Sequence, residues 1–296
     1  MNRKLREYLA DTSLITISLI WGSTFIIVKK TVELFEPITF VGLRFTLAFF
    51  IMLLFCWPRR KNFNYDLLKD GLIIGVSLFI VFTFQTLALK YSPASEVGFL
   101  TGLYVLFVPV LSAVFLKKYP HIFSWIGVIF SAAGMMMITM TDSLSLSVGQ
   151  SFAILNAFFI GIQIILTDKY SRKHDVVLLT AIEIGAVAAL SMIYSVLFEN
   201  PDYSQLRHSY VFYSLIFNAV IATVFCFFIQ MAMQKHTTPT KAAIMFTIEP
   251  ISSAFFSFFI GAEIMMFRQY AGAVMIISAI VIAETGTYLR LSKSKG

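Results

Sequence analysis

A carboxylate followed by a proline lies inside a strongly apolar stretch, at Glu249 and Pro250, where residues 242–256 read AAIMFTIEPISSAFF. At 1.5 Å per residue, Glu249 would lie about 16 Å along a helix that begins near Thr238, close to the midplane of a bilayer. An ionised side chain there costs about 2.5–3.5 kcal/mol, and Pro250 leaves the carbonyl of residue 246 without its helical donor. Such groups are tolerated only beside protein or a wet cavity. Glu249 is therefore a candidate substrate contact or proton carrier, or alternatively a structural acceptor that holds a neighbouring helix.

Two further charges lie within apolar stretches, Arg44 and Glu183. Counted from Pro37 and Asp175, where their helices would begin, they lie about 10 Å and about 12 Å deep, within a few Å of the midplane. We hypothesise that they neutralise each other or flank a central site. Together with Glu249 they are the candidate charge or coupling residues, and a proton-coupled mechanism would use Glu249 or Glu183. Arg44 would equally suit a substrate carboxylate, which a guanidinium binds through two parallel hydrogen bonds.

Neutral hydrogen-bonding side chains are scattered over other apolar stretches. Taken singly, each suits helix packing or an interfacial position better than ligand binding. Taken together they suit an amphipathic solute, provided that their helices line one cavity. With Glu249, the candidate substrate-binding residues are Trp21, Ser23, Thr24, Gln85, Thr101, Tyr104, Gln163 and Gln230, and the candidate helix breaks are Pro109 and Pro250.

The elements that would position these residues are membrane helices. The chain is 58% hydrophobic and 13% charged, whereas a soluble domain has about 25% charged residues. Apolar stretches of 18 residues or more can each cross about 30 Å of hydrocarbon. We therefore predict an all-α integral membrane protein with ten transmembrane helices, near residues 12–34, 37–57, 70–90, 93–116, 121–141, 149–168, 175–198, 209–233, 238–263 and 268–290.

The distribution of Lys and Arg predicts the orientation of these spans. With the N-terminus in the cytoplasm, the inside segments carry 16 basic residues and the outside segments carry 5. Because the loops are short, the positive-inside rule applies. We expect both termini to be cytoplasmic in a plasma, or inner, membrane. The net charge of +7 reflects this bias, and its spread over separate segments argues against nucleic-acid binding.

Ten spans divide into five and five, so the second half would enter the membrane with inverted topology, as in many secondary transporters. An offset of 145 residues places Gln85 on Gln230, and an offset of 139 places Gly22 on Gly161 and Arg44 on Glu183. We therefore expect two inverted five-helix repeats, residues 1–145 and residues 146–296.

Several short motifs also carry a family resemblance. These are WGSTF at residues 21–25, GFLTGLYVLFVPVLSAVFL at 98–116, AAIMFTIEPISSAFFSFFIGAEIM at 242–265, Gly272, and IVIAE at 280–284. In order and spacing the chain resembles EamA-type transporters of the drug/metabolite transporter superfamily. One departure is Lys117-Lys118, where that family often has Gly-Glu. The resemblance implies a ten-helix fold of two inverted repeats and the movement of small metabolites, often outward, including amino acids.

The sequence lacks the residue patterns that an enzymatic or metal-binding function would need. The four histidines lie in or beside predicted loops, and there is no HExxH motif, no phosphate-binding loop and no pair of aspartates within a span. Cys56 and Cys226 have no zinc-ligand spacing, and no nucleotide domain is present for an ATP-driven pump. We therefore expect no enzyme, no cofactor and no metal.

The function expected first is secondary transport of an amino acid or similar amphipathic metabolite, outward, by alternating access of the two halves. The energy would come from the proton gradient or from the gradient of the solute itself. One alternative is an uptake or exchange carrier for a nucleoside-like or vitamin-like metabolite. A second is a membrane assembly or interaction protein without cargo. The partners expected are the solute, the lipid bilayer and, in a coupled mechanism, protons, and the chain would act as a monomer or weak homodimer.

Overall fold

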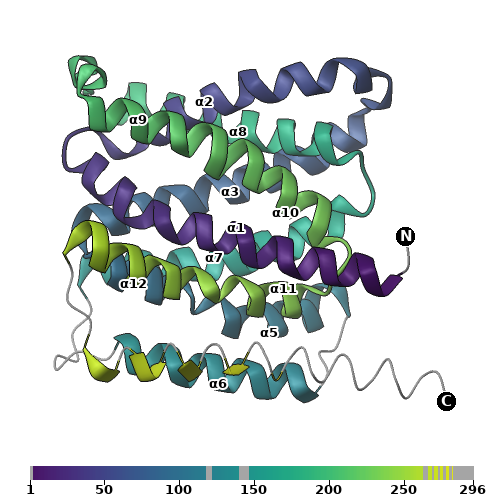
Figure 1. Ribbon diagram of the computed structural model, residues 1–296. Helices are drawn as coiled ribbons and strands as arrows, with labels where there is room; N and C mark the ends of the chain where they lie inside the picture. Colours follow the sequence, from purple (N-terminus) through teal and green to yellow (C-terminus); the bar gives the residue numbers. More distant parts are fainter. Residues whose placement is uncertain are drawn as a thin grey trace.

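The computed structural model describes residues 3–117, 122–139 and 147–262, together with scattered positions between 266 and 282. Every regular element in these ranges is a helix (Figure 1). The elements are α1 (Arg3–Val32), α2 (Pro37–Cys56), η1 (Trp57–Asn62), α3 (Tyr65–Tyr91), α4 (Ala94–Thr101), α5 (Tyr104–Leu116), α6 (Ile122–Thr139), α7 (Val148–Ser171), α8 (Val176–Phe198), η2 (Tyr203–Arg207), α9 (Ser209–Phe217), η3 (Asn218–Phe225), α10 (Cys226–Gln234), α11 (Pro239–Phe246) and α12 (Ile248–Gly261).

Eight helical segments in the described part of the chain are long and apolar enough to cross a membrane. A shorter apolar helical stretch, Trp125–Gly134, lies within α6. The prediction of an all-α membrane protein is therefore confirmed. The ends of the predicted fifth span and most of both the predicted tenth span and the closing motif at 280–284 lie outside the described residues, so the count of ten helices stays a prediction.

Side chains at the helix starts explain where several of these helices begin. Asn64 accepts a hydrogen bond from the first turn of α3, and Asp175 accepts two from the first turn of α8. Ser147 and Gln150 form a reciprocal capping box at the start of α7. Each satisfies backbone N–H groups that have no partner inside the helix. The short polar segments of the sequence thus fix the ends of the apolar helices.

Two spans are each interrupted near their middle. One is divided into α4 and α5 at Gly102 and Leu103, and the other into α11 and α12 at Thr247. Glycine weakens a helix, and the Thr247 hydroxyl donates a hydrogen bond to the carbonyl of Ile244, three residues earlier. The break predicted at Pro109 lies instead at Gly102 and Leu103, and Pro109 is inside α5.

Pro250 also lies beside a break rather than at one, because it is the third residue of α12. The first four N–H groups of a helix have no intrahelical acceptor. A proline at this position therefore removes no helical hydrogen bond, and the carbonyl predicted to lose its donor, that of residue 246, belongs to the end of α11.

The span predicted at 209–233 contains a π-helix, η3, between α9 and α10. The Thr223 hydroxyl donates to the carbonyl of Asn218, five residues earlier, at 2.8 Å. A π-helix inserts extra residues into a turn and occurs often at functional sites. The apolar pattern of the sequence does not distinguish it from an α-helix.

Small residues bring helices from distant parts of the sequence close together. α1 runs alongside α11 and α12 in Figure 1, and a Cβ added to Gly22 of α1 would lie 2.4 Å from Cβ of Ser252. At the contact of α2 with α8, a Cβ on Gly42 would lie 2.7 Å from the sulfur of Met192. Close approach of backbones is the usual way in which membrane helices gain packing energy.

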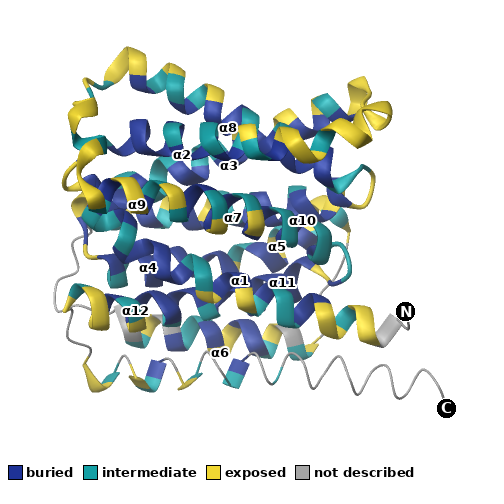
Figure 2. Ribbon diagram, turned by 45° about the horizontal axis from the view of Figure 1, so that its top comes forward, coloured by how far each residue is buried: buried dark blue, intermediate teal, exposed yellow. Residues whose placement is uncertain are grey.

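The outer surface of the bundle carries large apolar side chains, as a lipid-facing surface requires. Phe50, Leu54 and Phe259 are more than half exposed. Figure 2 shows buried positions concentrated on the inner helices, with exposed positions on outward faces and at the helix ends. The charged residues deep inside the spans, Arg44, Glu183 and Glu249, are instead buried in protein, where they can form a site.

Candidate functional site

A cavity of about 60 Å³, counted as the space open to the centre of a water molecule, lies among the helices. A single water needs about 10–15 Å³ by this measure, so the cavity has room for several waters or for a small solute. Helices from both halves of the sequence form its wall. The lining residues are Trp21, Thr24, Arg44, Leu78, Val81, Phe82, Gln85, Tyr104, Ile160, Gln163, Ile164, Phe227, Gln230, Phe246 and Glu249.

Seven of the nine candidate substrate-binding residues line this cavity: Trp21, Thr24, Gln85, Tyr104, Gln163, Gln230 and Glu249. The other two do not. The Ser23 hydroxyl donates to the carbonyl of Ile20 within α1, and the Thr101 hydroxyl donates to Oδ1 of Asn156 at 3.0 Å. These two residues stabilise helices next to the cavity instead.

Arg44 of α2 is 3% exposed and contributes to the cavity wall. Its Nε donates to the hydroxyl of Thr223 at 2.7 Å, and its guanidinium carbon lies 4.7 Å from the centre of the Phe82 ring. In the described part of the chain no carboxylate lies within ion-pairing distance of Arg44, and its two outer nitrogens have no hydrogen-bond partner. Its charge is therefore open to a ligand in the cavity.

Glu249 is the other charged residue in the wall, and it is 7% exposed. It lies in the first turn of α12, directly after the interruption at Thr247. No described residue forms a hydrogen bond or an ion pair with its carboxyl group. The cavity is thus bounded by one basic and one acidic side chain, each without a counter-ion among the described residues.

Glu183 of α8 lies behind the wall and does not line the cavity. It is 1% exposed, and its Oε1 accepts a 2.6 Å hydrogen bond from Nε2 of Gln163, which does line the cavity. The hypothesised pairing of Arg44 with Glu183 is not formed, because each side chain uses a different partner. Arg44 nevertheless lines the cavity itself, and Glu183 contacts the wall through Gln163.

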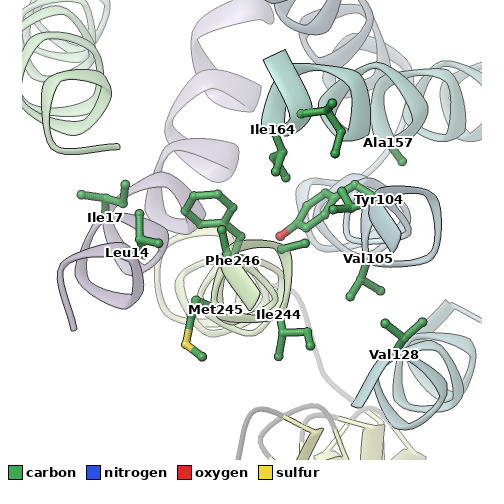
Figure 3. Packing of buried hydrophobic residues seen from close by; sticks show 14 of the residues in the cluster. Leu14, Ile17, Tyr104, Val105, Val128, Ala157, Ile164, Ile244, Met245 and Phe246 are labelled. Carbon is green, nitrogen blue, oxygen red and sulfur yellow. The ribbon is translucent and has the colours of Figure 1, made fainter. Parts of the chain in front are cut away.

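Aromatic rings make up much of the wall, and the sequence interpretation identified only Trp21 and Tyr104 among them. Trp21 donates from Nε1 to the carbonyl of Ala222 in η3 at 2.9 Å, and its ring packs against those of Phe227 and Phe246. Figure 3 shows Tyr104 of α5 extending toward Phe246 of α11. With 31 phenylalanines in the chain, no sequence signal separates Phe82, Phe227 and Phe246 from the rest.

Two polar residues beside the cavity were also missed. Asn156 of α7 is fully buried, accepts from Thr101, and donates to the carbonyl of Val81 at 2.8 Å. Its position in the middle of an apolar span was a usable signal. Thr223 had no such signal, because its role depends on the π-helix.

Within the described ranges, His, Cys, Asp and Glu side chains form no group of three or more that could hold a metal ion.

Comparison with known proteins relates the chain as a whole to a family. The model of the EamA-like transporter family matches residues 9–140 and residues 147–285. An "Uncharacterized transporter" of Archaeoglobus fulgidus is 30% identical over 280 residues, which cover 95% of this chain and 87% of that relative. The "Uncharacterized inner membrane transporter YedA" of Escherichia coli K12 is 21% identical, over 94% of this chain and 91% of YedA.

A solved structure, described only as "Crystal structure of protein", has the same fold. Its TM-score is 0.75 at 17% sequence identity, with 92% of this chain and 96% of that chain covered. At this identity the similarity concerns the fold alone. The family match spans most of the sequence and therefore supports membership of a family as well as the fold. This multi-pass membrane protein belongs to the EamA-like transporter family.

Proposed function

We propose that the protein is a secondary transporter that exports a small amphipathic metabolite, in the first place an amino acid, across the plasma membrane. The observation that carries this proposal is the presence of Arg44 and Glu249 on the wall of one cavity, each without a counter-ion among the described residues. A buried charge is costly unless it is paired. A zwitterion would offer a carboxylate to the guanidinium and an ammonium group to the glutamate, and so would pair both.

The rest of the wall suits the apolar part of such a solute. Trp21, Phe82, Phe227 and Phe246 present aromatic surface, while Gln85 and Gln230 add amide groups. Small-molecule sites typically combine apolar surface with a few polar groups that fix the orientation of the ligand. This composition favours an amino acid with an apolar side chain over a strongly polar metabolite such as a sugar.

The proposed mechanism is alternating access by two inverted halves, residues 1–145 and 146–296. The offsets of 145 and 139 residues found in the sequence also relate cavity-lining residues to one another. Five pairs of equivalent positions have both members in the cavity wall, which supports a two-fold relation through the cavity. The pairs are Phe82 and Phe227, Gln85 and Gln230, Tyr104 and Glu249, Trp21 and Ile160, and Thr24 and Gln163.

Helix packing supports the same relation. The interruptions at Gly102 and Thr247 are 145 residues apart. Gly22 packs against Ser252, and at the equivalent positions Gly161 packs against Phe107. Interrupted helices beside a central site, in two halves of opposite orientation, are the usual architecture of transporters that rock one half against the other. We propose that both termini lie in the cytoplasm, which the distribution of Lys and Arg favours.

The test begins with metabolite profiling of cells that express or lack the protein. The expected result is a solute that accumulates in the medium only with the protein, and that the purified protein moves across vesicle membranes. Retention of the solute inside cells would favour the uptake or exchange alternative. No change in any solute, in cells or in vesicles, would contradict transport and favour the role as an assembly protein.

Variants then test the two charges. Arg44→Gln and Glu249→Gln each remove one charge-assisted contact, worth about 1.5–3 kcal/mol, so we expect about a 10-fold to 100-fold loss of apparent affinity. Ser23→Ala is the matched control, because the Ser23 hydroxyl bonds only its own helix and does not line the cavity. A wild-type affinity in both charge variants would refute the zwitterion site.

A further inference from the structure

Glu183 and Gln163 form an isolated polar pair in the interior of the bundle. Nε2 of Gln163 donates to Oε1 of Glu183 at 2.6 Å. The other oxygen of each side chain, Oε2 of Glu183 and Oε1 of Gln163, is buried and has no hydrogen-bond partner. Two acceptors without donors in one buried pair are unusual, since nearly all buried polar atoms are hydrogen-bonded.

A proton on Glu183 would satisfy both of these oxygens at once. A carboxylic acid and a primary amide can form two hydrogen bonds in a ring: the amide N–H donates to the acid carbonyl, and the acid O–H donates to the amide carbonyl. The first bond is present. A proton on Oε2 of Glu183 would supply the second after a turn of the terminal groups, whose torsions are soft. An ionised carboxylate offers no donor, so both oxygens would stay unsatisfied.

No cation compensates an ionised Glu183. Among the described residues, no Lys, Arg or His lies within 4.0 Å of its carboxyl group. On α2, Arg44 is bonded to Thr223, and on α3, Asp70 is paired with Lys173 and His174. The remaining ionisable side chains of α8, of α7 and of the elements that pack against α8 are Cys56 on α2, Tyr65, Asp66, Lys69, Lys90 and Tyr91 on α3, Asp168, Lys169 and Tyr170 on α7, Tyr194 on α8, Arg59, Arg60 and Lys61 on η1, and Cys226 on α10.

We propose that Glu183 is a proton-binding site coupled to the cavity through Gln163. Its carboxylate takes up one proton from a hydronium ion of the surrounding solution, which leaves a neutral water molecule, and forms the acid–amide pair with Gln163. When the proton is released, the O–H···O bond is lost and the amide of Gln163 has to turn. Because Gln163 is part of the cavity wall, proton binding and solute binding then affect each other reciprocally. The coupling to transport rests on the proposed function, whereas the site itself does not.

Infrared difference spectroscopy on the full-length protein in lipid, over a series of pH values, tests the site without any solute. We expect a carbonyl band of a protonated carboxyl group that disappears in Glu183→Gln and persists in Glu249→Gln. Glu183→Gln should fold normally, because two primary amides can form the same ring of hydrogen bonds. A spectrum in which Glu183→Gln retains every protonated-carboxyl band of the wild type would overturn the proposal.

Gln163→Leu provides a second variant with the same measurement. It removes the N–H donor from the acid carbonyl, so the band assigned to Glu183 should shift in frequency. An unshifted band would show that the amide is not the partner of the acid, and would also overturn the proposal.

Transport by vesicles tests the coupling. In the pH range over which the infrared band of Glu183 appears and disappears, we expect the solute flux of the wild type to change by up to about tenfold per pH unit. This pH dependence should be lost in Glu183→Gln. An identical pH dependence in both proteins would refute the coupling. If the wild type moves no solute while the infrared band is present, the proposed function fails and the proton site stands.

Discussion

The hydroxyl of Thr223 accepts a 2.7 Å hydrogen bond from Nε of Arg44. The same hydroxyl donates to the carbonyl of Asn218, five residues earlier in the π-helix η3. Its own hydrogen is thereby directed along the helix, and its lone pairs are left for the guanidinium. The π-helix thus holds the guanidinium group of Arg44 in position, and we assign this group to the binding of the solute carboxylate.

Thr223→Val should weaken solute binding while it leaves the fold intact. Valine has nearly the same shape but offers no acceptor to Arg44, at a cost of about 1–2 kcal/mol, or about a 5-fold to 30-fold loss of apparent affinity. The concentration dependence of uptake into vesicles measures the effect. Thr180→Val is the control, since the Thr180 hydroxyl bonds only the carbonyl of Val176. An equal loss in both variants would argue against a positioning role for Thr223.

Gly22→Ala should destabilise the contact of α1 with α12. The added Cβ would lie 2.4 Å from Cβ of Ser252 and 2.6 Å from the backbone oxygen of Glu249, so the helices must move apart. Overpacking of this kind costs about 1–3 kcal/mol. Thermal unfolding in detergent should show a lower midpoint than for Gly161→Ala, whose Cβ comes no closer than 3.1 Å to its neighbours. A larger loss for Gly161→Ala would contradict this packing.

Asn156→Leu should remove a buried polar connection between α7, α4 and α3. Asn156 accepts from Thr101 and donates to the carbonyl of Val81, so leucine takes the acceptor away from the Thr101 hydroxyl and the side-chain donor away from a carbonyl of α3. Hydrogen bonds between membrane helices contribute about 0.6 kcal/mol on average and up to about 1.7 kcal/mol. A double-mutant cycle with Thr101→Val should give a coupling free energy of unfolding in this range. A coupling of zero would show that the two side chains act independently.

Asp70→Asn should loosen the end of the bundle that we place in the cytoplasm. Asp70 of α3 pairs with Lys173 at 2.8 Å and with His174 at 2.7 Å, both in the loop between α7 and α8. The hydrogen bond from Lys173 to Asp70 raises the pKa of Lys173 above its ordinary value. At neutral pH, where Asp70 is ionised, the ion pair is therefore fully formed; it stays so up to the ordinary lysine pKa of about 10.4, and its contribution is lost as pH rises through the raised pKa.

The thermal midpoint at neutral pH measures this change, and Asp70→Asn should lower it. Asp66→Asn is the comparison variant: this exposed acid in the first turn of α3 acts on Lys173 only through space and forms no hydrogen bond with it, so its loss should lower the midpoint less. The difference between Asp70→Asn and wild type should shrink at strongly alkaline pH. A difference that grows with pH would contradict the assigned ion pair.

The helices could be predicted from the sequence because apolar length and end signals are local properties. Residues 37–57 and 175–198 were expected as spans, and α2 and α8 occupy Pro37–Cys56 and Val176–Phe198. The interruptions were harder to predict. A helix break was predicted at Pro109, yet α5 continues through this residue. The interruptions lie at Gly102 and Thr247, and glycine and threonine are weaker indicators of a helix end than proline.

The candidate site could be predicted in part, because depth along a helix can be counted but rotation about its axis cannot. Counting placed Arg44 and Glu183 near the midplane. Only the structure shows that Arg44 faces the cavity and Thr223, while Glu183 faces Gln163. Ser23 and Thr24 illustrate the same point, since they are adjacent in sequence and only Thr24 lines the cavity.

The π-helix makes the angular register of everything after it depend on one turn. An α-helical residue advances about 100° around the axis, and a π-turn takes up one extra residue, so the residues after Asn218–Phe225 face about that much differently than they would in an uninterrupted α-helix. If all of these residues were wound as a regular α-helix, Phe227 and Gln230 of α10 would turn away from the cavity wall that they now line. Deleting one residue from the segment would instead restore α-helical winding and keep Phe227 and Gln230 on the wall, at the loss of the hydrogen bond from Thr223 to a carbonyl five residues earlier.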